Sequence, residues 1–178
     1  LCAPEASAVY HLAKALADGM SDRPDIHVLL ATTYLNAGRC AEAYERFAAI
    51  GPKVPKEDKA LFLYYHAQAA FGTGRYDEYL ALLGEAIALD RAAYGSTLVD
   101  AYLKVAERRN QAGDPAGYTE FLTKAVGESP DNAALHLKLG NAYAEAREYD
   151  KAKTQWRMVL DLEPDHPERM RLLNRMAR

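Results

Sequence analysis

The sequence predicts an all-α fold made of helical hairpins stacked in series. Its 178 residues are rich in Ala, Leu, Glu, Lys and Arg and poor in Val, Ile and Thr, a composition that favours helices over strands. No segment alternates with the two-residue period of a strand for long enough to form one. Short helix breaks recur at steps of 36, 39 and 34 residues when Gly38, Gly74, Gly113 and Arg147 are taken as equivalent. Helical pattern on both sides of breaks with a period near 34 residues predicts stacked helix pairs.

Each break separates two segments whose apolar or small residues have helical spacing, which places them on one helix face. The segments before the breaks carry Leu30, Tyr34 and Leu35; Leu63, Ala67 and Phe71; Tyr102, Val105 and Ala106; and Leu139 and Tyr143. The segments after the breaks carry Ala43, Phe47 and Ile50; Tyr79, Leu83 and Ala86; Tyr118, Leu122 and Ala125; and Ala152, Trp156 and Val159. Helix stops between successive pairs are Gly51, Pro52, Pro55, Ser129, Pro130 and Pro164.

Further helices are expected at both ends of the chain. Residues 5–18 carry Ala8, Leu12 and Ala15 with the spacing of the second helices, which indicates an orphan half-repeat. Residues 168–177 form an amphipathic pattern that would cover the open end of the stack, as capping elements of repeat arrays do. Because the chain begins with Leu and with half a repeat, we expect a fragment of a longer protein.

These residues resemble the tetratricopeptide repeat family, whose pattern is Trp-x2-Leu-Gly-x2-Tyr, then Ala-x3-Phe, then Pro. The last repeat matches best, with His136, Leu139, Gly140, Tyr143, Ala152, Trp156 and Pro164. The first repeat is close to the pattern, with His27, Leu30, Ala31, Tyr34, Ala43, Phe47 and Pro55. The middle repeats are degenerate, because Tyr79 and Tyr118 stand where the pattern has Ala, but they keep the small residues Ala67 and Ala106. The resemblance implies a right-handed α-α superhelix of about four hairpins. It also implies one domain over 1–178, with an orphan helix at 5–18, repeats at 24–57, 60–93, 99–132 and 133–166, and a capping helix at 168–177.

Composition and charge exclude several classes of function. A formal net charge of −3 gives no general attraction to polyanions, so we expect no nucleic-acid partner. The basic residues of the last helix are expected to form a solvated face, since no aromatic residues for base stacking interleave with Arg169, Arg171, Arg175 and Arg178. No run approaches the ~18 apolar residues that span a bilayer, so we expect no direct membrane insertion.

The two cysteines and the overall style of the sequence bear on its origin. Cys2 and Cys40 cannot build a disulfide framework. Lipid attachment at Cys2 stays open, although Leu1 is a poor residue before a cleavage site. The Ala- and Arg-rich style points to a bacterial protein, and its compartment, cytoplasm or periplasm, stays open.

No catalytic or cofactor-binding pattern is recognisable. No two of the five histidines lie at i, i+3 or i+4, and HExxH is absent, which argues against a metal site on a helix face. His27 and His136 hold equivalent motif positions and are expected to be structural. Gly72, Thr73 and Gly74 are not followed by the Lys-Ser/Thr of a phosphate loop. We therefore expect no catalytic residues, no metal and no cofactor, and a protein that is not an enzyme.

The resemblance also implies where a partner binds. In this family the first helix of each hairpin lines the concave face, and ligand peptides lie there. The implied inward-facing positions are Asp25, Val28, Thr32, Leu61, Tyr64, Gln68, Phe71, Asp100, Leu103, Glu107, Leu137 and Asn141. This mixed apolar and acidic strip argues against the Lys-, Arg- and Asn-lined clamp that binds chaperone carboxylates. We expect the partner-binding residues to be Tyr64, Gln68, Phe71, Leu103, Glu107 and Asn141.

The sequence thus predicts a non-catalytic scaffold or adaptor that binds a protein or peptide partner. For Tyr64 and Phe71 the alternative is packing against a neighbouring repeat. Two other functions stay open, a homo-oligomerising assembly module and a regulatory or recruiting domain of a larger enzyme.

Overall fold

The computed structural model describes residues 4–17 and 23–177, and no strand occurs among them. The α-helices are α1 (Pro4–Ala17), α2 (Pro24–Asn36), α3 (Cys40–Ile50), α4 (Lys59–Gly72), α5 (Tyr76–Leu89), α6 (Arg91–Tyr94), α7 (Thr97–Gln111), α8 (Pro115–Glu128), α9 (Ala133–Glu145), α10 (Tyr149–Leu162) and α11 (Arg169–Met176). Two 3₁₀ turns, η1 (Gly51–Lys53) and η2 (Lys56–Asp58), join α3 to α4. The predicted all-α fold class is confirmed. The question of a lipid at Cys2 falls outside the described residues.

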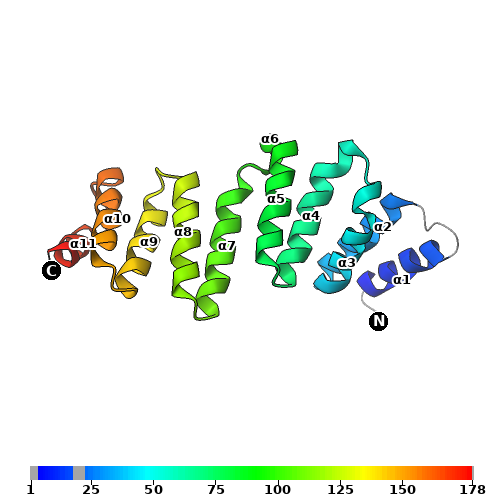
Figure 1. Cartoon of the computed structure of the whole chain (residues 1–178), viewed down its shortest axis with the longest axis horizontal. Helices are drawn as coiled ribbons and strands as arrows, with labels where there is room; N and C mark the ends of the chain where they lie inside the picture. The colour runs from blue at the N-terminus through cyan, green and yellow to red at the C-terminus, as the bar shows by residue number, and fades with distance from the viewer. Residues whose placement is uncertain (1–3, 18–22, 178) are drawn as a thin grey trace. The chain divides into compact units, whose positions relative to one another are not determined.

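The chain divides into two compact units, residues 1–95 and 96–178. In the first unit α2 pairs with α3 and α4 with α5, while α1 packs on α2 and α3 on α4 (Figure 1). In the second unit α7 pairs with α8 and α9 with α10, while α8 packs on α9 and α11 on α10. These pairs follow the residue ranges given above for the repeats, except that α4 begins at Lys59 and α7 at Thr97, one and two residues before the expected starts. The grouping of all repeats into one domain stays a prediction.

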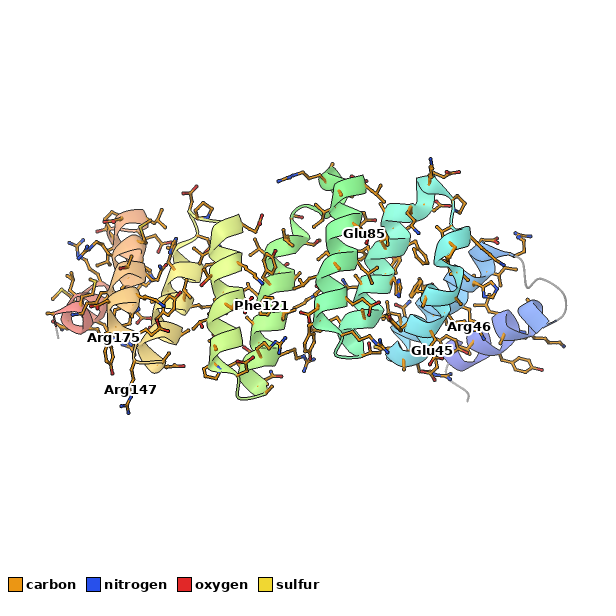
Figure 2. All side chains as sticks on the ribbon, viewed as in Figure 1. Glu45, Arg46, Glu85, Phe121, Arg147 and Arg175 are labelled. Carbon is orange, nitrogen blue, oxygen red and sulfur yellow. The ribbon has the colours of Figure 1, made fainter. Side chains whose placement is uncertain are left out.

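The same turn closes every hairpin. Gly38, Gly74 and Gly113 have φ angles of 73°, 78° and 72°, and Arg147 has a φ of 62° at the equivalent place. The next backbone N–H donates to the carbonyl five residues earlier: Arg39 to Tyr34 (2.9 Å), Arg75 to Ala70 (3.0 Å), Asp114 to Arg109 (2.9 Å) and Glu148 to Tyr143 (2.8 Å). This left-handed cap satisfies the free carbonyls at a helix end and favours glycine. Arg147 therefore occupies a glycine position, with its side chain directed away from the helices (Figure 2).

Polar caps fix several helix starts. The Asp114 carboxylate accepts from the backbone N–H of Gly117 (2.8 Å) at the start of α8, and the Asn132 amide oxygen accepts from Leu135 (3.2 Å) at the start of α9. Sequence reasoning missed α6. Its cap is the Asp90 carboxylate, which accepts from the backbone N–H of Ala93 (3.0 Å).

Large side chains of one helix pack against small residues of its partner. Ala31, Ala67, Ala106 and Gly140 are all buried, as the motif requires. A Cβ atom added to Gly140 would lie 2.6 Å from both Cδ1 and Nε1 of Trp156, so α9 and α10 approach closely at this point. The core of the first unit includes Leu30, Tyr34, Phe47, Phe62 and Leu63, and that of the second includes Trp156, Val159 and Leu172.

Contacts between successive repeats join residues one repeat apart. The Tyr44 hydroxyl on α3 donates to a Glu78 carboxylate oxygen on α5 at 2.5 Å, across 34 residues of sequence. The Arg75 guanidinium lies 4.4 Å from the centroid of the Tyr44 ring. The hydrogen bond to Glu78 raises the pKa of Tyr44, because ionisation of the phenol would break it.

Candidate functional site

A cavity of about 820 Å³ lies in the first unit between α2, α4 and the segment that joins α3 to α4. Its lining is formed by Arg23, Asp25, Val28, Leu29, Thr32, Asn36, Val54, Pro55, Asp58, Leu61, Phe62 and Tyr65. Leu29 and Leu61 are 55% and 48% exposed, although leucine usually lies in the interior of a folded protein. The cavity therefore presents apolar side chains to solvent.

Several polar side chains of this cavity form hydrogen bonds or ion pairs with other residues of the chain. The Thr32 hydroxyl donates to the carbonyls of Val28 and Leu29, both at 3.0 Å, so its polar atom is turned back onto its own helix. Arg23 and Asp25 form an ion pair at 2.7 Å, and the hydrogen bond from Arg23 lowers the pKa of the Asp25 carboxyl. Asp58 has no ion pair with another described residue. The floor is thus apolar and the free charge at its edge is negative.

The structure brings together some of the predicted inward-facing positions and separates others. Asp25, Val28, Thr32 and Leu61 meet in the cavity. Tyr64, also on α4, is half-buried and stacks on Tyr94 of α6, with ring centroids 5.0 Å apart. Phe71 is half-buried against Tyr76 and Tyr79 at 5.5 and 5.1 Å, and Gln68 lies between Tyr64 and Phe71 in sequence on the same helix.

The other predicted partner-binding residues lie in the second unit. Leu103 and Glu107 are one turn apart on α7, where the Glu107 carboxylate accepts from the Gln111 amide at 3.1 Å. Asn141 on α9 accepts a hydrogen bond from Arg175 Nη1 on α11 at 2.9 Å. Whether these residues contact a partner stays a prediction.

The expectation that Arg175 belongs to a solvated face is wrong. Its guanidinium lies 4.0 Å from the centroid of the Trp156 ring and also binds Asn141. The signal that could have revealed this contact is the spacing of 34 residues between Asn141 and Arg175, which places them at equivalent positions in successive repeats. Sequence reasoning also missed Leu29, Val54 and Tyr65 as cavity residues, because none holds a motif position.

His136 is buried, and both of its ring nitrogens have partners within the chain. His136 Nδ1 lies 2.7 Å from Gln155 Oε1, and Nε2 lies 2.8 Å from the Pro130 carbonyl oxygen. A neutral imidazole cannot donate to two oxygens, so a neutral His136 requires the Gln155 amide to present its NH₂ group instead. Within residues 4–17 and 23–177, no three His, Cys, Asp or Glu side chains gather as they would around a metal ion. In the same ranges no helix has the length and apolarity needed to cross a bilayer.

Comparisons with known proteins agree with this architecture. Residues 110–176 match the tetratricopeptide repeat model. No curated protein matches the chain in sequence. A solved structure of MamA is similar at 20% identity with a TM-score of 0.54, covering 88% of this chain and 86% of that one. The C-terminal part of a TPR repeat-containing protein from Cytophaga hutchinsonii has 20% identity and a TM-score of 0.58, covering 91% and 61%. YrrB, described as a TPR protein with an unusual peptide-binding site, has 18% identity and a TM-score of 0.54, covering 96% and 82%.

At these identities the solved structures establish the fold, and the sequence match in the second unit establishes the kind of repeat. The hairpin turns and small-residue contacts in both units are those that the family pattern requires. Residues 110–176 therefore match the tetratricopeptide repeat family in sequence, and the chain as a whole has the fold of solved TPR structures.

Proposed function

We propose that this protein is a non-catalytic interaction scaffold whose first unit binds a peptide or protein segment in the cavity between α2 and α4. The observation that carries the proposal is the pair of half-exposed leucines, Leu29 and Leu61, in one cavity of about 820 Å³. Full burial of a leucine side chain stabilises by ~1.5–3 kcal/mol, so covering the exposed half of each contributes roughly 1 kcal/mol. The fold is generally a protein-interaction fold, and the YrrB structure carries a peptide-binding site.

The chemistry of the cavity favours an apolar segment with a basic residue beside it. Apolar side chains would cover Leu29 and Leu61, while Asp58 offers a carboxylate at the edge. The proposal extends to the other predicted residues, Tyr64, Gln68 and Phe71 on α4 and Leu103, Glu107 and Asn141 in the second unit, as further contacts along the partner.

The test is a peptide selected from a random display library against the full chain and measured by fluorescence anisotropy. Leu29→Ser and Leu61→Ser should each weaken binding roughly fivefold, from the apolar contact that each loses. Leu89→Ser is the matched control, because Leu89 is 58% exposed in the same unit and does not line the cavity. Equal affinities for all three variants would refute the cavity as the binding site. A further pair, Tyr64→Ala and Phe71→Ala, measures whether that face of α4 contributes.

Self-association is a second candidate, favoured by exposed apolar residues on the terminal helix. Met170 and Leu173 of α11 are 68% and 40% exposed. If copies associate through this helix, the mass measured by light scattering should rise with concentration, and Met170→Ser should abolish the rise. A monomer mass at every concentration would exclude this function.

A further inference from the structure

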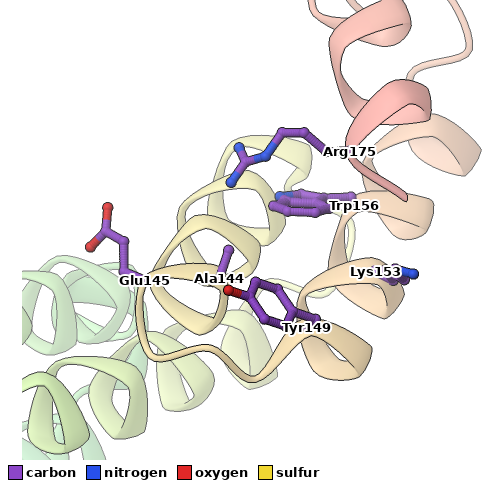
Figure 3. Close-up of a pocket in the computed structure, with 6 residues that line it drawn as sticks. All are labelled: Ala144, Glu145, Tyr149, Lys153, Trp156 and Arg175. Atoms are coloured by element: carbon purple, nitrogen blue, oxygen red, sulfur yellow. The ribbon is translucent and has the colours of Figure 1, made fainter. Parts of the chain in front are cut away.

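A second cavity, of about 480 Å³, lies in the second unit between α9, α10 and α11. It is lined by Ala144, Glu145, Tyr149, Lys153, Trp156 and Arg175 (Figure 3). Tyr149 is 57% exposed, so a large aromatic surface is open to solvent beside this cavity. None of these residues lines the cavity of the first unit.

Arg175 is one of three charged residues that line this cavity, and it lies beside the Trp156 indole (Figure 3). Its guanidinium lies over the Trp156 indole, 4.0 Å from the ring centroid, and Nη1 donates to Asn141 Oδ1 at 2.9 Å. A guanidinium has five N–H donors, and among the described residues Asn141 accepts a hydrogen bond from one nitrogen of Arg175, which leaves other donors for a ligand. Stacking on Trp156 and the bond to Asn141 hold the planar group in one orientation, which lowers the entropy lost when it binds a ligand.

The other two charged residues are turned elsewhere. Figure 3 shows the Glu145 carboxylate directed away from Tyr149, and the Lys153 amino group directed away from Trp156. Neither has an ion pair with another described residue. The cavity therefore combines one oriented cation with the apolar surfaces of Tyr149 and Ala144.

We propose that this cavity binds an acidic side chain of a partner peptide. The carboxylate accepts from the free N–H groups of Arg175, and the apolar side chain next to it in the peptide covers Tyr149 and Ala144. Charge complementarity selects this occupant, because a carboxylate matches the planar donor edge of a guanidinium. This site is separate from the cavity of the first unit, and it would select a partner peptide that carries an acidic residue.

The position of the single tryptophan provides a direct measurement. Trp156 is the only tryptophan of the chain and it lines this cavity, so its fluorescence reports occupancy here. The probe is the peptide acetyl-Gly-Glu-Leu-Gly-amide, compared with the same peptide carrying Gln in place of Glu. We expect a saturable fluorescence change with a Kd of ~1 mM for the Glu peptide, and binding at least about tenfold weaker for the Gln peptide.

Matched variants test the role of the guanidinium. Arg175→Gln should abolish the preference for Glu over Gln, whereas Arg171→Gln should keep it. Arg171 carries the same charge on the same helix, but it pairs with Glu168 at 2.9 Å and does not line the cavity. Circular dichroism of both variants shows whether the helices are intact, and Arg175→Lys, which keeps the charge, should retain part of the preference.

Several results would overturn the assignment. One is an equal response to the Glu and Gln peptides, and another is an unchanged preference in Arg175→Gln. A response confined to acetyl-Gly-Gln-Leu-Gly with a free C-terminus would identify a terminal carboxylate as the ligand instead. No saturable response up to ~10 mM would exclude the site. None of these readings involves Leu29 or Leu61, so the two proposals fail independently.

Discussion

Adding one methyl group at Gly140 should destabilise the second unit, although alanine is the better helix former. A Cβ at this position would lie 2.6 Å from Cδ1 and Nε1 of Trp156, about 0.8 Å inside ordinary van der Waals contact, which begins at 3.4 Å. The indole is a rigid ring that is 3% exposed and lies beneath Arg175, so it has little room to move. Such overpacking costs ~1–3 kcal/mol. Glycine-to-alanine replacement inside a helix recovers at most ~1 kcal/mol, so the net change is destabilising.

Gly127→Ala provides the matched control for this effect. Gly127 lies on α8 in the same unit, is exposed, and has nothing within 4 Å of an added Cβ. Both variants gain the helix propensity of alanine, so the difference between them isolates the overpacking cost, ~1–3 kcal/mol. The assay is urea unfolding followed by Trp156 fluorescence, which reports the second unit. If Gly140→Ala is as stable as Gly127→Ala, the close approach of α9 and α10 at this point is wrong.

Two further predictions concern a buried histidine and a turn. His66 is buried among the rings of Tyr44, Phe47 and Phe62. Burial lowers the pKa of its imidazole from 6.5; the charge of Glu78 opposes this shift, and the charge of Lys59 adds to it. The unfolded state therefore takes up the proton at a higher pH than the folded state, so the unfolding free energy should fall as the pH drops below 6.5. Urea unfolding measured at several pH values should show a smaller fall for His66→Phe than for the unchanged protein. Arg147→Gly should raise the unfolding free energy by up to ~1 kcal/mol, because a non-glycine residue at a φ of 62° is strained, whereas Gly113→Ala should lower it.

The helical hairpins could be predicted from the sequence because local chemistry determines them. The glycine breaks and the small residues at helix contacts act within one hairpin, over fewer than forty residues, and the structure has the left-handed turn at each break. Even Arg147, which stands where the other turns have glycine, can be recognised as a turn residue from its sequence distance to the other turns.

The surroundings of the candidate site residues could not be predicted as well. Tyr64 was expected to be free for a partner or packed on a neighbouring repeat, and its neighbour Tyr94 belongs to α6, a short helix with no motif. Leu29 lines the cavity beside Val54 and Asp58 of the segment that joins α3 to α4, and none of these three residues holds a motif position. The position of Arg175 depended on a contact one repeat away, which helix periodicity within α11 does not report.

The contacts between Tyr44 and Glu78 and between Asn141 and Arg175 each span 34 residues, one repeat length. Inserting a single residue into a helix between two such partners would rotate everything after it by about 100°, and the partners would no longer face each other. Gain or loss of a whole repeat would instead supply a new partner at the same spacing. A chain held together in this way can change its length through duplication or deletion of whole repeats, while the register within each repeat stays fixed.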